Sequence, residues 1–344
     1  MTLLEGLPRP VDTSHPPGQV PRVSVGMPVY NADDFVREAI ESHLAQHFGD
    51  FELIISDNAS TDTTGDICRE LAARDPRIRY VRAAQNHGAA WNFNHVLSLA
   101  RGDYFKWSAA DDVCAPGLLC ACTAALDADP GAVLAQPGAA IIDEDGLVAY
   151  AFEDVVSLGP WPRAPKPRVA MLLQALFQSG LAAVAAVHGV ARTAALRSLR
   201  PFGSYFGSDF ALVTELATRG RFVQVPGELA FFRRHAASSS GYTRRPSARR
   251  MQQFFDPRGG SALRQELNLR RRYYEVARAI ATAPLSRRDR AVLLALTARL
   301  LAGRAAWRLR FELGKAPPPA SASAPKPPVH WSEAGSSGYH PSSS

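Results

Sequence analysis

The chain has 344 residues, of which 46% are hydrophobic and 21% are charged, and its formal net charge is +7. These proportions are those of a globular protein with one large domain or two of moderate size. The four cysteines lack the spacing of a disulfide framework or a zinc site, the N-terminus lacks a signal-peptide pattern, and no apolar run reaches the length of a membrane span. We therefore expect a cytoplasmic protein.

Strands and helices are predicted to alternate over the first third of the chain. Apolar runs predict strands at residues 23–29, 51–55, 78–81 and 102–107. Helical periodicity lies between them, at residues 35–44, 63–73 and 88–100. We expect Asn31 or Asp33 to cap the first helix. This alternation predicts βαβ units and a mainly parallel sheet.

Polar side chains and one aromatic ring stand where three of these strands end. Tyr30 follows the first strand, Asp57 follows the second, and Asp111 and Asp112 follow the fourth. Because the carboxyl ends of parallel strands share one edge, we expect these residues in a single crevice. Tyr30 could stack on a base there and Asp57 could accept a hydrogen bond from it. Each residue alone also fits an ordinary turn, strand end or helix cap.

The adjacent carboxylates of Asp111 and Asp112 favour a divalent cation. At about 4 Å and an effective dielectric of about 20, two such charges repel by roughly 4 kcal/mol. A cation that bridges to phosphate oxygens removes this cost, and Mg²⁺ is usually held in that way.

The pattern changes after Pro116. Strands are expected at 133–136 and 222–225, a hairpin with an Asp-Gly turn at 140–148, and an extended segment at 184–190. Helices are expected at 166–177, at 193–199, from a cap at Ser208 to about Arg219, and within 261–310 with a break near Pro284. Residues 1–20 and 314–344 are rich in Pro, Gly, Ser or Ala, and we expect a flexible lead-in and a disordered tail.

Four blocks of sequence stand out by their order and spacing. They are Val25-Gly26-Met27-Pro28-Val29-Tyr30-Asn31, Ile55-Ser56-Asp57-Asn58-Ala59-Ser60-Thr61-Asp62, Asn86-His87-Gly88 with Asn92 and Asn94, and Asp111-Asp112 with Pro116. Together they resemble family 2 glycosyltransferases of the GT-A fold. The resemblance implies an α/β fold with a mixed, mainly parallel, Rossmann-like sheet flanked by helices. The implied organisation is a catalytic domain at 21–240, with a nucleotide-binding half at 21–116 and an acceptor half at 117–240, and a basic helical extension at 241–313.

The same resemblance implies an activity and its site residues. The family transfers a sugar from a nucleotide-diphosphate donor to an acceptor hydroxyl with inversion, usually with Mg²⁺ or Mn²⁺. It implies donor-nucleotide contacts by Pro28, Tyr30, Asn31, Asp57, Asn58, Asn86, Asn94 and Asp111. It implies metal binding by Asp112 and His235, and diphosphate binding by Arg234 and Ser239. The run Gly207-Ser208-Asp209 matches the motif that carries the catalytic base, which would be Asp209, while His188 and Arg192 would face the acceptor.

Two departures from the family pattern keep other functions open. Ala109 stands where the family has the first Asp of Asp-x-Asp-Asp, and Ser208 stands where Glu is usual. A non-catalytic protein that retains the nucleotide cleft is therefore an alternative, and a sugar nucleotidyltransferase is a weaker one. Arginines outnumber acidic residues several-fold between Arg233 and Arg310, which points to peripheral contact with an anionic membrane or to simple packing. No nucleic-acid motif is evident, so we expect no nucleic-acid partner.

Overall fold

A computed structural model describes residues 20–151, 160–178, 185–236, 254–255, 257, 262–312 and 330–334. The predicted alternation of strands and helices is confirmed in its first part. The elements there are β1 (Val23–Val29), α1 (Val36–Leu44), β2 (Phe51–Asp57), α2 (Thr64–Arg74), β3 (Ile78–Arg82), α3 (Ala89–Leu99) and β4 (Tyr104–Trp107). Adjacent strands in this part pair in parallel, with β1 between β2 and β4. Their carboxyl ends therefore meet at one edge of the sheet.

The second part extends the same sheet and changes its direction. Its elements are β5 (Val113–Cys114), α4 (Leu118–Ala128), β6 (Ala132–Ile142), β7 (Val148–Ala151), α5 (Pro165–Gln178), β8 (Val190–Arg192), α7 (Thr193–Arg197), α8 (Ser208–Arg219) and β9 (Arg221–Arg233). The strand order is β3-β2-β1-β4-β8-β6-β9-β5, with β7 paired to β6. Because β8 is antiparallel to both β4 and β6, and β9 is parallel to β6, β9 ends at the same edge as β4.

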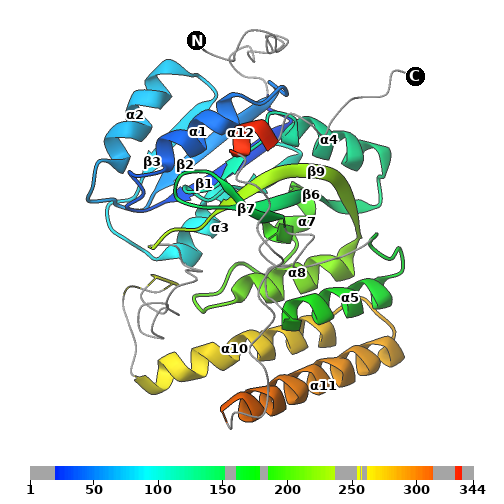
Figure 1. The fold of residues 1–344 in the computed structure, drawn as a ribbon. Helices are drawn as coiled ribbons and strands as arrows, with labels where there is room; N and C mark the ends of the chain where they lie inside the picture. The colour runs from blue at the N-terminus through cyan, green and yellow to red at the C-terminus, as the bar shows by residue number, and fades with distance from the viewer. Residues whose placement is uncertain are drawn as a thin grey trace.

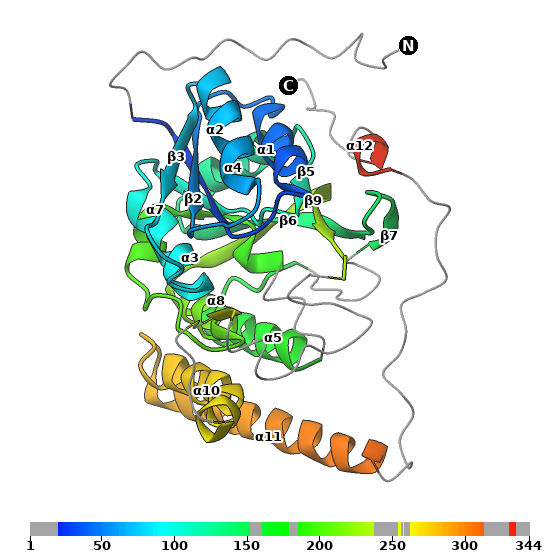
Figure 2. The same cartoon turned by 90° about the vertical axis from the view of Figure 1, so that its left-hand side faces the viewer.

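Helices cover both faces of the sheet (Figures 1 and 2). One face packs against α1, α2 and α4 through a core that includes Val25, Ile40 and Leu118. The other face packs against α3, α5 and α8 through a core that includes Phe105, Leu172 and Leu216. The alternation of Tyr104 and Phe105 between these two cores is the period-2 pattern of a strand buried on both faces.

Two long helices form an outer layer against α5 and α8 (Figure 1). They are α10 (Ala262–Ala281) and α11 (Arg287–Glu312), which confirms the predicted helical C-terminal part. Val276 and Leu293 are fully buried against the second core, so this layer is packed onto the domain. None of the helices within the described ranges offers an apolar stretch that would span a lipid bilayer. A last short helix, α12 (Trp331–Ala334), lies within the tail for which we expect no structure.

Three local expectations differ from the structure. Helix α1 begins only at Val36, with no side-chain cap, because Asp33 instead accepts a hydrogen bond from the Thr63 hydroxyl at 2.9 Å. Gly207, and not Ser208, is the N-cap of α8. Residues 185–187 are helical where we expect extended chain, and only Val190–Arg192 form a strand.

Candidate active site

The loop after β4 brings Asp111 and Asp112 to the end of β9. Val113 pairs with Phe231 across the short β5, so the carboxylates face the residues that follow β9. Asp112 Oδ1 accepts a hydrogen bond of 2.9 Å from the backbone N–H of Arg233. Asp111 Oδ2 lies 3.0 Å from Nε2 of His235. The structure thus brings together three residues that the sequence associates with a cation and a ribose.

The environment of Asp112 favours a nearby cation. Burial, and next the negative charge of Asp111, raise the pKa of Asp112 well above its usual range, and the Arg233 N–H opposes this rise only in part. Carboxylates are ligands that suit both Mg²⁺ and Mn²⁺. These residues fit a divalent cation in chemistry. In the described part of the chain, however, no three Asp, Glu, His or Cys side chains converge into a preformed metal site.

Arg233 fixes the position of this loop. Its side chain is 1% exposed, and its Nη2 donates a hydrogen bond of 2.6 Å to Glu38 of α1. Nε donates to the Asp111 carbonyl at 3.0 Å, and Nη1 donates to the Glu144 carbonyl at 2.8 Å. The sequence resemblance assigns the diphosphate contact to the next residue, Arg234. The backbone N–H of Arg234 donates a hydrogen bond of 2.8 Å to the Ile142 carbonyl.

Asp57 ends β2 in a fully buried position. Its carboxylate accepts hydrogen bonds from the Ser60 N–H at 2.8 Å, from the Tyr80 hydroxyl at 2.7 Å and from the Arg82 guanidinium. Burial works to raise the pKa of Asp57, but these donors outweigh it and hold the pKa below its usual value. Tyr80 and Arg82 were not among the predicted site residues. The parallel register, which sets Asp57 opposite Arg82, explains why they meet.

The loops after β1 and β2 interlock beside Asp57. Asn31 has a positive φ of 47°, and its Oδ1 accepts a hydrogen bond of 2.8 Å from the Thr61 N–H. Asn58 Nδ2 donates to Asn86 Oδ1 at 2.9 Å, which joins the second loop to the one before α3. Next to them Tyr30 is 45% exposed, so its ring is available to a ligand. Pro28, the remaining residue of this predicted group, lies within β1 opposite Ser56.

Asp209 lies in the first turn of α8, after a glycine that the chain needs there. Gly207 has a φ of 79°, and a Cβ on it would come within 2.8 Å of the Arg272 side chain of α10. Burial raises the pKa of Asp209 to about 6, opposed by its own N–H, by the Phe210 N–H and by the charge of Arg272. A carboxylate with that pKa is suited to accept a proton near neutral pH.

Arg272 reaches this site from outside the predicted catalytic region. Its guanidinium lies over the rings of Phe206, Phe210 and Tyr273, with distances to the centroids of 5.3, 5.7 and 4.6 Å. These contacts place a positive charge beside Asp209. No sequence motif marked this arginine, because its role depends on how α10 packs against α8.

Two other predicted residues have structural partners. Both polar atoms of the Asn94 amide bind the backbone of Phe202, at 3.0 and 2.9 Å. Arg192 donates to the carbonyls of Leu126 and Ala132, both at 2.7 Å, so it is turned to the C-terminal end of α4. Neither is brought to the carboxylates by these contacts.

His188 lies closer to the candidate site. Its Nδ1 is 3.3 Å from the Trp107 carbonyl at the end of β4, and its ring is 5.4 Å from that of Phe232. Burial, followed by the charge of Lys106, lowers the pKa of His188 to about 3, so the ring is neutral. The predicted diphosphate residue Ser239 lies outside the described residues.

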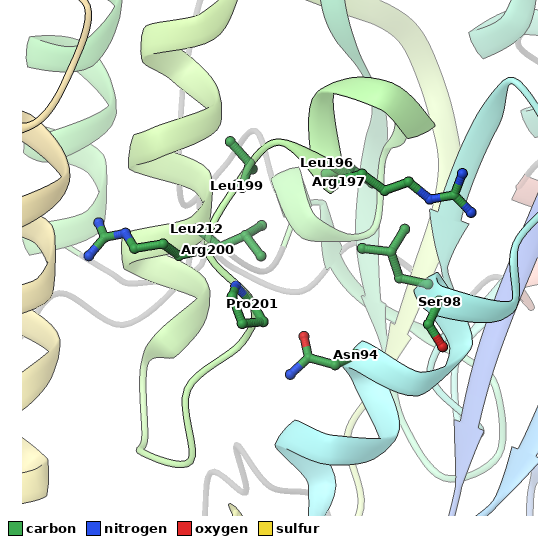
Figure 3. A pocket seen from close by; sticks show the side chains of 9 residues that line it. Asn94, Ser98, Leu196, Arg197, Leu199, Arg200, Pro201 and Leu212 are labelled. Atoms are coloured by element: carbon green, nitrogen blue, oxygen red, sulfur yellow. The ribbon is translucent and has the colours of Figure 1, made fainter.

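A cavity of about 190 Å³ lies between α3 and the segment that leads into α8 (Figure 3). Its lining includes four leucines and two arginines and carries no carboxylate; the residues are Asn94, Leu97, Ser98, Leu196, Arg197, Leu199, Arg200, Pro201 and Leu212. Because it does not include the carboxylate loop, we do not assign it to the donor.

Comparison with known proteins finds similarity to glycosyltransferases. Residues 24–169 match the family model described as Glycosyl transferase family 2. EpsE of Bacillus subtilis (strain 168) is 37% identical over 128 residues, which cover 37% of this chain and 46% of EpsE. Glycosyltransferase GlyG of Streptococcus pneumoniae serotype 4 is 34% identical over 91 residues, which cover 26% of this chain and 30% of GlyG. The matches thus span less than half the length of these relatives.

The fold is similar to that of a solved structure, S. aureus TarS 1-349. In its complex with UDP it superposes with a TM-score of 0.59 and 17% identity, covering 85% of this chain and 75% of that chain. The form in complex with UDP-GlcNAc gives a TM-score of 0.57 and 18% identity, with 82% and 73% coverage. At this level of identity the similarity establishes the GT-A-like fold.

Proposed function

We propose that the chain, whose residues 24–169 match the model of glycosyl transferase family 2, moves a sugar from a nucleoside-diphosphate donor to an acceptor hydroxyl with inversion. The observation that carries the proposal is the paired carboxylates Asp111 and Asp112, held at the sheet edge by Arg233 and His235. A UDP-sugar is the first donor class to test, since TarS was solved with UDP and UDP-GlcNAc.

The proposed donor site runs along the edge of the sheet. Tyr30 stacks on the base, Asp57 orients it, and Asp111 meets the ribose. Asn31, Asn58 and Asn86 shape the loops around the nucleotide, and their side-chain hydrogen bonds support that role. A cation held by Asp112 and His235, when bound, neutralises charge on the leaving diphosphate. Arg234 and Ser239 add donors to the same diphosphate, because a guanidinium fork matches phosphate oxygens.

The proposed chemistry needs one base. The Asp209 carboxylate takes the proton of the acceptor hydroxyl while that oxygen bonds to the anomeric carbon, and the bond from that carbon to the diphosphate oxygen breaks. Attack from the face opposite the leaving group inverts the configuration. The raised pKa of Asp209 supports this role, since a base titrating near 6 is ionised at neutral pH and still accepts a proton readily.

The proposal also assigns contacts to the acceptor and to the membrane. His188 adjoins the carboxylate loop through Trp107 and is our acceptor-side residue. Helices α10 and α11 form the outer layer of the fold. The exposed Arg270, Arg271 and Arg278 of α10 support contact with an anionic leaflet. Cell-envelope polysaccharides or glycolipids are the acceptor class that we propose.

Titration calorimetry with UDP, GDP and dTDP, each with and without Mn²⁺, tests the proposal. We expect one nucleotide to bind in a Mn²⁺-dependent manner and Asp112→Ala to remove that dependence. Binding of no nucleotide under either condition would contradict the proposal. A retained nucleotide site without hydrolysis of any sugar nucleotide would favour the non-catalytic alternative that Ala109 and Ser208 keep open.

A further inference from the structure

The C-terminal segment His330–Ala334 packs against the domain beside the carboxylate loop. In Figures 1 and 2, α12 lies next to α1, far from α11, which precedes it in the sequence. Leu147 forms an isolated antiparallel β-bridge with His330, and the backbone N–H of Trp331 donates a hydrogen bond of 3.1 Å to the Gly146 carbonyl. The fit is close, because a Cβ on Gly146 would come within 2.8 Å of the His330 ring.

Trp331 is connected to the carboxylate loop by consecutive hydrogen bonds. Its Nε1–H donates a hydrogen bond of 2.7 Å to Oε1 of Glu38. The other carboxylate oxygen of Glu38 accepts a hydrogen bond of 2.6 Å from Nη2 of Arg233. Arg233 in turn donates from Nε to the Asp111 carbonyl and from its backbone N–H to Asp112 Oδ1. One indole N–H therefore fixes the carboxylate that orients the arginine of the candidate site.

Two further contacts reach the same loop. The turn on which Trp331 rests supplies carbonyls of Asp143 and Glu144 to the Arg233 guanidinium, at 3.2 and 2.8 Å. The indole also packs on Phe231, with 5.9 Å between ring centroids, and Phe231 is the strand partner of Val113, which follows Asp112. Trp331 thus touches the carboxylate, the turn and the ring that together surround Arg233.

We infer that Trp331 is a positioning residue for the Asp111-Asp112 loop and that the segment 330–334 completes the cation and diphosphate subsite of the proposed transferase. Trp331 holds Glu38 and the 143–146 turn in place, and these hold Arg233 and hence the two carboxylates. The identity of the ligand in this inference rests on the proposed function. The effect of Trp331 on the order of the Asp111-Asp112 loop does not, so the inference and the proposed function can fail separately.

The test uses the 344-residue chain with Trp331→Phe, which keeps an aromatic ring and removes the N–H donor. Trp161→Phe is the matched control, because the buried Nε1 of Trp161 has no hydrogen-bond partner among the described residues and its ring packs on Phe222 in the other core. Amide hydrogen exchange in metal-free protein reports the order of residues 109–113. Calorimetry of Mn²⁺ in the presence of UDP reports the subsite.

In the Trp331→Phe variant we expect exchange at 109–113 to accelerate and Mn²⁺ binding to weaken, each by roughly threefold to tenfold, as the loss of one net hydrogen bond implies. Trp161→Phe should change neither. In a Glu38→Ala background, Trp331→Phe should have much less effect, because both changes break the same connection.

Several results would overturn the inference. One is unchanged exchange at 109–113 in Trp331→Phe, and another is an equal effect of that change with and without Glu38. A gain of Mn²⁺ affinity on losing the indole N–H would show instead that the segment restrains the site. If the unaltered protein binds no nucleotide, the proposed function fails, while the exchange experiment still decides the role of Trp331.

Discussion

Replacing Asp209 with asparagine should make the protein more stable and inactive. Burial raises the pKa of Asp209 from 3.8 to about 6, so the folded state favours the protonated carboxyl. A group of this kind contributes stability that is fully present below about pH 3.8 and is lost as the pH rises through about 6. At 1.36 kcal/mol for each pKa unit, the ionised carboxylate costs the folded state roughly 3 kcal/mol at pH 8.

Asparagine keeps the shape of the side chain and cannot ionise. We therefore expect Asp209→Asn to raise the free energy of unfolding at pH 8 by up to about 3 kcal/mol and to change it little at pH 4. Urea unfolding at the two pH values measures this difference. Hydrolysis or transfer from the preferred sugar nucleotide should fall by at least about a hundredfold, which is the usual scale of a general base.

Asp66→Asn is the matched control, because Asp66 also stands in the first turn of a helix but its side chain is 74% exposed. Its effect on stability should stay within about 0.5 kcal/mol. A loss of stability in Asp209→Asn at pH 8, or a gain that is equal at pH 4 and pH 8, would refute the reasoning from burial. Full activity of the variant would refute the assignment of the base.

Three further changes test separate parts of the site. Asp57→Asn should lower the free energy of unfolding at pH 7 by about 1–3 kcal/mol in urea, because Arg82 and its neighbours lose a charged acceptor; unchanged stability would contradict this. Tyr30→Ala should weaken nucleotide binding in calorimetry by roughly fivefold to a hundredfold through lost stacking, with an unchanged melting temperature since the ring is 45% exposed; equal affinity would remove Tyr30 from the site. Arg272→Gln should raise the pKa of Asp209 and so move the acid limb of the pH–rate profile to higher pH, while Arg272→Lys should move it less; a limb that does not move would separate this arginine from the base.

The sequence was sufficient to predict the first four strands and the polar residues that follow three of them, whereas β5 was not predicted and β6 and β9 are longer than expected. Alternating apolar runs predict β1, β2 and β4, and the rule that parallel strands end together predicts the edge where Asp57 and Asp112 lie. The meeting of Asp111 with His235 also agrees with the motif order. These features depend on local pattern and on one general property of α/β sheets.

Contacts that depend on tertiary packing could not be predicted in this way. The pairing of Asp57 with Arg82 follows from strand register, which a single sequence does not give. The approach of Arg272 to Asp209 requires α10 to pack on α8. The hydrogen bond between Trp331 and Glu38 joins residues that are 293 positions apart in the sequence. The composition of the tail does not predict this contact.

The most direct test of the central claim is hydrolysis of a panel of sugar nucleotides by the purified chain in the presence of Mn²⁺, followed by proton NMR of the released sugar. We predict turnover of one donor, release of the sugar with inverted anomeric configuration, and loss of turnover but not of nucleotide binding in Asp209→Asn. Retention of configuration, or turnover that persists in Asp209→Asn, would contradict the account.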